Sequence, residues 1–270
     1  MIELRVLASG SRGNAAMLQI GDSNRHVMID AGLSPRRTRH ALESGGGSHH
    51  TLSDVLLTHG DGDHLHAGWA RAVSSWGFTL HVHERHAHRV ERAGIPRDRV
   101  STFEDGVNLG DGIRVDTALA PHDSHGTSAL VLRYQEASLG WATDLGRVDA
   151  DLRRFFAAAA PSVMAIESNY DPVMQRASDR PAFLIERIMG GAGHLSNEEA
   201  LDAVEHISTA CDLEHIVLLH RSEQCNCPRV IEALWRTRAP HLADRMSIAS
   251  QSAPLGPVRI GATTGAAHPT

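Results

Sequence analysis

Short apolar runs that end in aspartate or histidine recur along this chain, and they constrain its fold more than any other feature. Such runs indicate buried strands, because they are rich in aliphatic residues and are bounded by turn formers. Five of them, HVMID, VLLTH, TALAPH, LGWATD and IVLLH, close on Asp30, His59, His122, Asp144 and His220. In a layered fold, strand ends of this kind gather along one edge, where binding sites are usually built.

The predicted strands and helices form two series along the chain. The first holds the strands ELRVLAS, AAMLQIG, RHVMIDA, DVLLTH and 79–83, with helices at about 35–43, 66–76 and 84–93. The second holds the strands IRVDTALA, SALVLRY, ASLGWATD, SVMAIES and HIVLLH, with helices at about 148–159, 178–189, 194–208 and 226–238. Ser196, with Glu199 three residues later, forms a capping box at the start of the helix within 194–208.

The candidate ligands come from both series, so neither series is a separate domain. We expect an α/β protein in which two sheets pack face to face with helices outside, as one domain over residues 1–250. Residues 251–270, QSAPLGPVRIGATTGAAHPT, are small and rich in Gly, Pro and Thr. They are expected to form a loose, partly disordered C-terminal segment.

The composition of the chain indicates its cellular compartment and the partners that it can bind. No apolar run approaches the roughly 18 residues that a membrane span needs, and MIELRVLASG predicts a first strand rather than a signal peptide. Three cysteines are an odd count and indicate no disulfide framework, so we expect a cytoplasmic protein without a membrane partner. The net charge of −6 gives no general attraction to nucleic acid, so a polyanionic substrate would need a local positive site.

The segment LLTHGDGDHLHAG holds the densest group of metal-binding side chains, in a chain with 19 histidines. His59 and Asp61 alternate, so on an extended segment they point the same way and can hold one ion. Asp63 and His64 lie at a turn into the next helix and can face a second ion. His66 falls in the first helical turn and is expected to face solvent.

The other strand ends complete this set. Asp144 has two carboxylate oxygens and can bridge the two ions, while His122 would complete the first ion's ligands and His220 the second's. This gives roughly four ligands per ion, the number that zinc-type sites want, with room for a shared water. We therefore expect two divalent metal ions, zinc or manganese.

The motif THGDGDHLHAG resembles the metallo-β-lactamase-fold signature, His-x-His-x-Asp-His followed by a glycine. The resemblance continues through ASGSRGNA, IDAG, PHD, ATDLG, IESNYD, GHLSNEEA and LLHRSE, over about residues 4–235. In this order the motifs are similar to the YycJ/WalJ-like branch of the superfamily, small bacterial hydrolases regarded as phosphodiesterases or 5′-exonucleases.

The resemblance implies a four-layer αββα sandwich with the active site on one edge, in agreement with the strand-end argument. It also implies that Asp30 orients the ligand loop from behind. The family's metal ligands carry over to His59, Asp63, His64, His122, Asp144 and His220.

Asp61 departs from the family pattern, which usually has its second histidine there. Aspartate binds metals through oxygen, and replacing nitrogen by oxygen shifts preference from zinc toward harder ions such as manganese or magnesium. We interpret the site as active with an altered metal preference rather than as inactive, because a site that has lost its function would usually lack more than one ligand. Asp61 is accordingly counted as a ligand.

Two ions about 3.5–4 Å apart can hold a bridging hydroxide that attacks phosphorus. Asp63 could both bind metal and orient this nucleophile.

His194 precedes a helix start, where anions bind favourably, and is a candidate to bind a phosphate or protonate the leaving oxygen. Ser196 and Asn197 lie nearby as weaker substrate-binding candidates. The same stretch is also an ordinary capping motif.

Several other segments have plainer explanations. GSRGN, at 10–14, could cradle a phosphate with Arg12, but a hairpin turn explains it equally well. LHVHERHAHR, at 80–89, lacks the spacing of a metal site. Cys225 and Cys227 are too close for an ordinary zinc ribbon. The arginines at 36, 37 and 39 indicate a solvated helix face, with a nucleic-acid track as the lesser alternative.

The leading hypothesis is a dinuclear metal-dependent phosphodiesterase or nuclease that acts on nucleic acid, from a 5′ end if it is an exonuclease. A hydrolase of small esters, thioesters or lactones on the same fold is the alternative enzyme, since the pocket rather than the scaffold sets function. A non-catalytic metal-binding regulator with a weakened site is the alternative of another class. The sequence leaves the oligomeric state open, with a homo-oligomer as one option.

Overall fold

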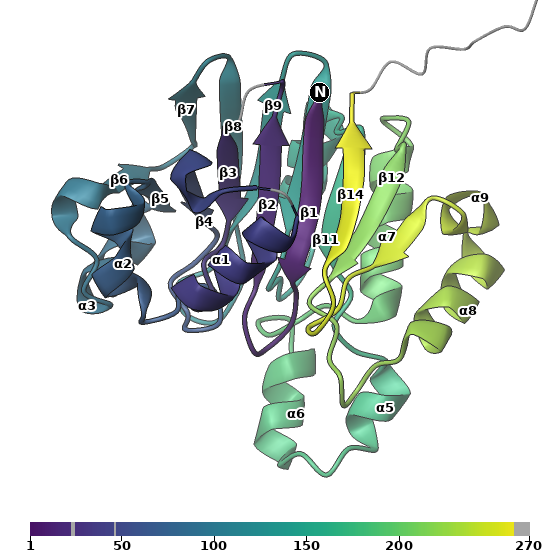
Figure 1. Cartoon of the computed structure of the whole chain (residues 1–270). Helices are drawn as coiled ribbons and strands as arrows, with labels where there is room; N and C mark the ends of the chain where they lie inside the picture. The colour runs from purple at the N-terminus through teal and green to yellow at the C-terminus, as the bar shows by residue number, and fades with distance from the viewer. Residues whose placement is uncertain (23–24, 46, 262–270) are drawn as a thin grey trace, which may run out of the picture.

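Two seven-stranded sheets pack face to face in the computed structural model, which describes residues 1–22, 25–45 and 47–261 (Figure 1). The first sheet has the order β14-β1-β2-β3-β4-β5-β6 and the second the order β13-β12-β11-β10-β9-β8-β7. The strands of the first are β1 Ile2–Ala8, β2 Ala15–Ile20, β3 His26–Ile29, β4 Leu52–Leu57, β5 Thr79–His83, β6 Val100–Phe103 and β14 Leu255–Ile260. Those of the second are β7 Gly106–Gly110, β8 Ile113–Ala120, β9 Thr127–Tyr134, β10 Ala137–Ala142, β11 Val163–Glu167, β12 His215–Leu219 and β13 Met246–Ile248.

Each sheet is antiparallel in one half and parallel in the other. Strands β14, β1, β2 and β3 pair antiparallel, whereas β3 to β6 pair parallel. In the second sheet β7 to β10 are antiparallel and β10 to β13 parallel. The carboxyl ends of parallel strands meet at the same edge, so both sheets present a row of strand ends to one site.

Helices cover the outer face of each sheet and make four layers. α1 Pro35–Ser44, α2 Trp69–Trp76 and α3 Ala87–Arg92 lie on the first sheet. α4 Ala150–Ala159, α7 Asn197–Ser208, α8 Pro228–Arg238 and α9 Pro240–Ala243 lie on the second. A third apolar cluster joins the inner faces of the two sheets. The predicted αββα sandwich is confirmed.

Burial along the strands explains why the sheets face each other in this way. The edge-side strand β8 alternates between buried and exposed residues, which is typical of an antiparallel strand with one wet face. The central parallel strand β11 is buried throughout, because helices cover one side of it and the other sheet covers the opposite side.

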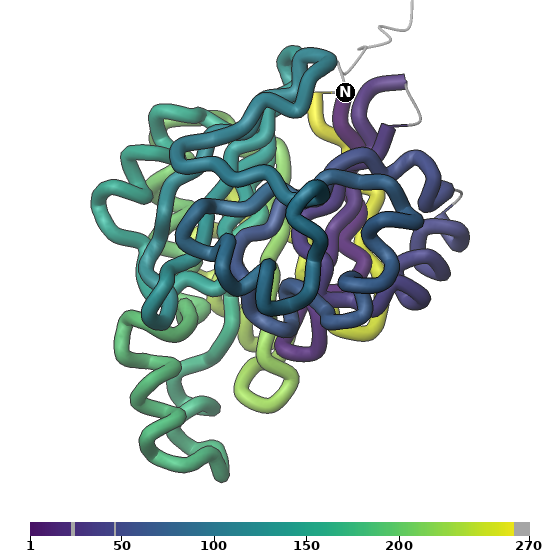
Figure 2. The backbone as a smooth tube through the Cα atoms, turned by 90° about the vertical axis from the view of Figure 1, so that its left-hand side faces the viewer, coloured from purple at the N-terminus to yellow at the C-terminus, as the bar shows by residue number. Residues whose placement is uncertain are grey.

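Two further helices, α5 Pro172–Arg176 and α6 Ala182–Met189, project beyond the edge of the sheets (Figures 1 and 2). The helix predicted at about 178–189 corresponds to α6, which begins later, at Ala182, whereas α5 was not predicted. Pro172 begins α5 and Pro181 precedes α6, and a proline within a continuous helix would remove a hydrogen bond. The helix predicted at 84–93 likewise begins as a short 3₁₀ turn, Glu84–His86, before α3.

The C-terminal segment is part of the fold as far as β14. Its register pairs Ile2 with Ile260 antiparallel, and the Ile260 side chain is fully buried between the sheets. The expectation of a loose segment from residue 251 was therefore wrong for 255–260, because the Gly and Pro content masked the apolar residues Leu255, Val258 and Ile260. Residues 262–270 lie outside the described residues.

Local signals predicted the starts of two helices correctly. Ser34 caps α1 with Pro35 at its first position, and Ser196 and Glu199 form the predicted capping box at α7. Within the described residues no helix is long and apolar enough to cross a membrane.

The role of β14 predicts the effect of one substitution. Ile260→Ala should lower the free energy of unfolding by about 2–5 kcal/mol, since it removes buried methyl groups from the core between the sheets. Arg259→Ala, on the exposed face of the same strand, should change it by about 0.5 kcal/mol or less. Urea unfolding of the two variants measures this, and equal effects would show that β14 does not contribute to the core.

Candidate metal centre

Three candidate residues follow strands in left-handed backbone conformations. Asp30 after β3 has φ 60°, Asp144 after β10 has φ 54°, and His220 after β12 has φ 50°. Positive φ is uncommon outside glycine, and aspartate and histidine tolerate it better than branched residues. The backbone thus leaves the sheet abruptly at each position, while all three side chains stay buried.

The structure brings the seven predicted ligands together at this edge. One group contains His59, Asp61 and His122, and a second contains Asp63, His64 and His220, with the ligand atoms of each group within 4.8 Å of one another. Asp144 lies against the second group: its Oδ2 is 2.8 Å from His64 Nε2, and its Oδ1 is 3.6 Å from His220 Nε2. Asp144 also groups with His59 and His64.

His220 provides the test of whether these residues fit a metal ion. Its Nε2 is buried and has no hydrogen-bond partner among the described residues. The nearest carboxylate oxygens, of Asp63 and Asp144, each lie 3.6 Å away. With metal–ligand bonds of about 2.0–2.2 Å, ligand atoms that share one ion lie roughly 3–4 Å apart. The donor set therefore fits a divalent cation.

Asp30 lies behind the ligand loop. Its carboxylate accepts hydrogen bonds from the Thr58 backbone N–H at 2.8 Å and from the Thr58 hydroxyl, and its Oδ2 lies 2.8 Å from His64 Nδ1. Because Asp30 contacts Nδ1, the Nε2 atom of His64 faces the other candidate ligands. Carboxylates beside metal sites orient histidine ligands in this way.

Glu167 is a central residue that the sequence reasoning missed. It ends β11, is fully buried and accepts a hydrogen bond from the Leu145 N–H at 2.7 Å. Its Oε1 lies 2.7 Å from His194 Nδ1 and 3.3 Å from His220 Nδ1, so one carboxylate orients both imidazoles. The signal was available, since SVMAIES is another apolar run that ends at an acidic residue, but only Asp and His ends were considered.

His194 lies beside this group and at the rim of a cavity. Its ring stacks on His220 with centroids 5.2 Å apart, and Nδ1 is engaged by Glu167. None of the described residues bonds Nε2. The side chain is part-exposed and lines a cavity of about 360 Å³, together with His122 and residues of α6. This ring nitrogen is available to a substrate.

Asp61 divides its carboxylate between two partners. Oδ1 forms an ion pair with Arg89 Nη1, while Oδ2 lies 3.7 Å from His59 Nε2. Gly60 permits this pairing, because a Cβ there would come within 2.7 Å of Arg89 Cβ. One oxygen is left for an ion, and the guanidinium balances the carboxylate's charge. The pair is then neutral overall, like the imidazole that the family motif has at this position.

The remaining predicted residues have other contacts. Ser196 caps α7, and Asn197 is buried, where it donates to Asn226 and accepts from Ser168, so neither side chain is free to face a substrate. Arg12 is exposed and paired with Glu223. From the same loop Asn14 reaches the centre instead, with Nδ2 2.9 Å from His64 Nε2.

The other histidines do not extend the centre. His66 is exposed and accepts a hydrogen bond from the Gly68 N–H. His81 lies 2.8 Å from Asp54, and the buried His86 ring is 6.3 Å from that of His59. None of them belongs to a group of three or more potential ligands within the described residues.

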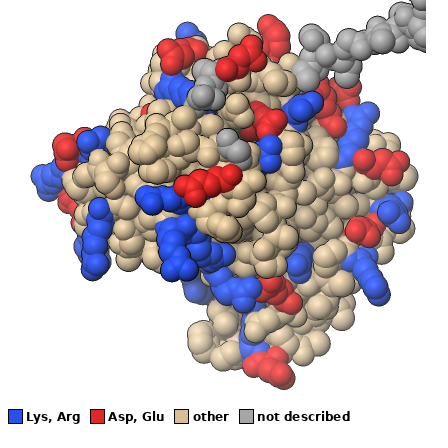
Figure 3. Space-filling view, in the orientation of Figure 1, with Lys and Arg blue, Asp and Glu red and all other residues tan. Residues whose placement is uncertain are grey.

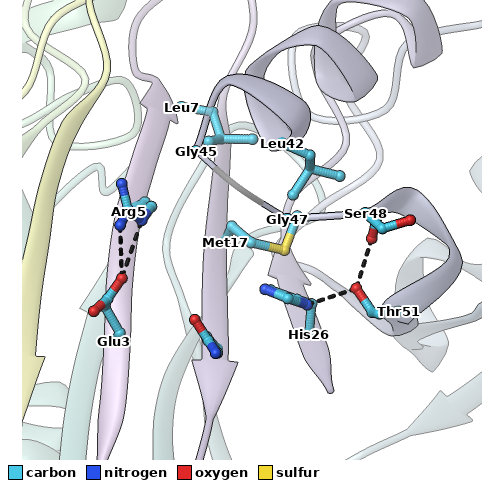
Figure 4. A pocket seen from close by; sticks show the side chains of 11 residues that line it. Glu3, Arg5, Leu7, Met17, His26, Leu42, Gly45, Gly47, Ser48 and Thr51 are labelled. Carbon is cyan, nitrogen blue, oxygen red and sulfur yellow. Dashed lines mark hydrogen bonds and ion pairs between the residues drawn. The ribbon is translucent and has the colours of Figure 1, made fainter. Parts of the chain in front are cut away.

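A second hollow, of about 140 Å³, lies on the outer face of the first sheet below the end of α1 (Figure 4). Its walls carry the Arg5–Glu3 ion pair and a contact of 2.7 Å between His26 Nδ1 and the Thr51 hydroxyl. None of its lining residues belongs to a group of potential metal ligands among the described residues. The strand-end edge is therefore the functional candidate.

Comparison with known proteins agrees with this geometry. The family model described as "Beta-lactamase superfamily domain" matches residues 25–220. The chain belongs to this superfamily. It is a metal-dependent hydrolase of the metallo-β-lactamase fold.

Relatives of this superfamily member include two proteins named exodeoxyribonucleases. YycJ from Bacillus anthracis is 28% identical over 224 residues, 82% of this chain and 83% of that protein. WalJ from Streptococcus pneumoniae serotype 2 is 28% identical over 205 residues, 74% of each chain. Among solved structures, zinc-bound PqqB from Methylobacterium extorquens matches with a TM-score of 0.68 at 18% identity, covering 95% of this chain and 100% of that one. The resemblance to the YycJ/WalJ-like branch is confirmed.

Buried carboxylates control the protonation of the histidines in this β-lactamase-superfamily centre. Burial opposes the charged form of His64, but Asp30 and Asp144 on either side raise its pKa well above the ordinary value. Burial likewise opposes the charged form of His220, while Asp144, Asp63 and Glu167 raise its pKa to about 10. By contrast, burial and the neighbouring His64 hold the pKa of His59 well below its ordinary value.

These shifts predict proton release on metal binding. A proton and a metal ion compete for the same imidazole nitrogen, so metal affinity should rise with pH. The raised pKa values of His64 and His220 mean that both are protonated at pH 7 in the metal-free protein. Binding should then release about two protons per chain, measurable by titration calorimetry in buffers of different ionisation enthalpy. Release of no protons would contradict this protonation state.

Asp61 predicts a difference in metal preference. Asp61→His should raise the ratio of zinc to manganese affinity by about tenfold or more, because nitrogen replaces a harder oxygen ligand. Competition with a chromophoric chelator measures both affinities. His66→Ala, in the same loop but outside the ligand groups, should leave both within about twofold. An unchanged ratio in Asp61→His would show that Asp61 is not a ligand.

Proposed function

We propose that this protein is a dinuclear phosphodiesterase that cleaves nucleic acid, with DNA as the first candidate substrate. The observation that carries this proposal is the arrangement of two ligand groups next to Asp144, beside a Glu167–His194 pair that opens into an arginine-lined cavity. The names of the relatives, exodeoxyribonucleases YycJ and WalJ, support DNA and action from a chain end.

Two ions fit this site better than one. The groups around His59 and around His64 each offer three ligand atoms, and Asp144 can add a ligand to both, since it also groups with His59 and His64. Three protein ligands plus a shared carboxylate give about four per ion, the usual number for zinc-type sites. Zinc and manganese are the candidate ions, with Asp61 favouring the harder of the two.

The bound ions would supply a nucleophile from water and neutralise charge that develops on the phosphoryl group. Asp63 is the residue best placed to orient that nucleophile. Its Oδ2 lies 3.7 Å from His64 Nε2 and 3.6 Å from His220 Nε2, so the carboxylate stands among the ligands. Its side chain is also 29% exposed, whereas Asp144 is buried, so Asp63 is accessible to solvent.

His194 would protonate the leaving oxygen. Glu167 Oε1 lies 2.7 Å from Nδ1, which fixes the ring orientation. The free Nε2 can then donate its proton to the departing alkoxide, a role for which a positioned imidazole is well suited near neutral pH. Glu167 acts here as a positioning residue.

A hydrolysis panel tests the proposed function. Purified protein, loaded with manganese or zinc, is assayed on bis(4-nitrophenyl) phosphate, 5′-phosphorylated single-stranded DNA, RNA and a lactone. We expect cleavage of the diester and of DNA, with loss of about 100-fold or more in Asp63→Ala, because the nucleophile loses its orientation. Metal content is measured on the same samples, with two ions per chain expected.

Each alternative predicts a different result in this panel. Activity on the lactone alone would show a small-molecule hydrolase, and activity that survives Asp63→Ala would contradict the mechanism. A protein that takes up no ion in supplemented medium would be a non-catalytic regulator rather than this enzyme.

The role of His194 predicts a dependence on the leaving group. His194→Gln should lower kcat for DNA by about 100-fold or more, because the alkoxide that leaves needs a proton. For bis(4-nitrophenyl) phosphate the loss should be small, since nitrophenolate leaves without protonation. Glu167→Gln should act in the same direction. Equal losses on both substrates would indicate that His194 only supports the structure of the centre.

A further inference from the structure

We propose that Arg180 binds a second phosphate of the substrate in a groove beside the metal centre, so that the site is built for an oligonucleotide strand rather than an isolated diester. This inference rests on the proposed function, since the first phosphate is the one at the metal ions. It adds a binding subsite on the α5–α6 arm, outside the ligand groups described above.

The groove consists of two adjoining cavities. The cavity of about 360 Å³ reaches from His122 and His194 at the metal centre to Arg180. The next, of about 240 Å³, continues outward past Arg12 and Arg221. The two share four lining residues, Ser11, Arg180, Ser222 and Gln224. Arg180 therefore lies where a strand leaving the centre would pass.

The ionic partners of the arginines differ along this groove. Arg187 pairs with Asp123 and Arg12 with Glu223, so their charges are balanced within the protein. Arg180 has no carboxylate within 4 Å in the described part of the chain, and its charge is left for an outside anion.

Neutral side chains hold the Arg180 guanidinium in place. Nη2 donates to Gln224 Oε1 at 3.1 Å and to the Ser222 hydroxyl at 3.4 Å, and Nη1 donates to Gln175 Oε1 at 3.2 Å. Amide oxygens orient the group without neutralising it. Gln175 is itself fully buried at the base of the arm. A fixed, uncompensated guanidinium is the arrangement that suits phosphate recognition.

Arg221 strengthens the case in the outer cavity. Its Nη1 donates only to the backbone carbonyls of Ser222 and Asn226, and its buried Nε has no partner among the described residues. The hydroxyl of Ser11 also lines both cavities and can donate to a phosphate oxygen. Among the described residues no carboxylate lies within 4 Å of Arg180 or Arg221, and Glu223, which pairs with Arg12, is the only acidic residue that lines the two cavities.

Another arginine-rich surface competes as a nucleic-acid site. The chain contains no lysine, so its 26 Lys and Arg residues are all arginines. Several of these arginines gather on the outer helical layer over α1 (Figure 3). Arg36, Arg37 and Arg39 are exposed there. They line neither of the two cavities that form the groove, so we assign the substrate strand to the Arg180 groove.

The first test separates one phosphate from several. In metal-loaded protein, Arg180→Ala should raise KM for a 5′-phosphorylated hexathymidylate about tenfold, the loss of one charge-assisted contact. Its kinetics on bis(4-nitrophenyl) phosphate should stay within about twofold, because that diester has no second phosphate. Equal changes on both substrates would overturn the subsite, since they would indicate a general disturbance of the centre.

The second test does not depend on catalysis. Fluorescence anisotropy measures binding of 3′-fluorescein-labelled hexathymidylate to metal-free protein over a range of salt concentrations. Arg180→Ala should weaken binding and reduce the slope of log affinity against log salt by about 0.7, the value for one contact with a single strand. If the wild type hydrolyses neither substrate, the proposed function fails, but this assay still decides whether Arg180 binds a phosphodiester strand.

Matched variants complete the test. Arg176→Ala removes an exposed arginine from the same arm but outside the groove, and should leave affinity and salt slope unchanged. Arg180→Lys should retain part of the affinity, since it keeps the charge without the planar fork. Thermal unfolding of each variant checks folding. The proposal is overturned if Arg180→Ala binds like the wild type, if Arg176→Ala loses as much, or if Arg37→Ala alone reduces the salt slope.

Discussion

The rest of the site depends on three carboxylates that are buried at one edge of the sandwich and need compensating positive charge. Asp30, Asp144 and Glu167 are at most 2% exposed, and in the described part of the chain imidazoles are their only ionic partners. Burying uncompensated carboxylates is costly, so this edge must hold positive charge. Protons on His64 and His220 can supply it in the metal-free protein, and divalent ions can supply it in the working enzyme. The strand-end turns deliver these groups to a single place.

The sequence predicted the parts of this site that follow from local patterns. Asp144 and His220 could be found because each ends an apolar strand, and carboxyl ends of parallel strands meet in space. The α7 capping box could be predicted for a similar reason, because Ser196 and Glu199 lie only three residues apart in the sequence. The Asp61–Arg89 pair could not be found in this way, because it joins residues 28 positions apart and depends on space above Gly60. Glu167 fitted the strand-end pattern but was passed over for its residue type, and the β14 residues were hidden by their Gly-rich surroundings.

The fold places the candidate metal ligands and the proposed substrate groove largely on different elements. The candidate metal ligands lie in the turns and loops that follow strands, whereas the groove is lined largely by the α5–α6 arm and the loop after β12. Family membership therefore accounts for a hydrolase, but not for its substrate. In this chain the balanced pairs Arg187–Asp123 and Arg12–Glu223 contrast with Arg180, which side-chain amides hold and which pairs with no carboxylate among the described residues. That contrast makes the groove suited to a nucleic-acid strand despite the net charge of −6.

The central claim is that this edge binds two ions that share Asp144. Anomalous diffraction from crystals of the manganese-loaded protein tests it most directly. The account predicts two peaks about 3.5–4 Å apart. One should lie among His59, Asp61 and His122, and the other among Asp63, His64 and His220. A single peak among Asp144, Glu167, His194 and His220, or no peak at this edge, would contradict it.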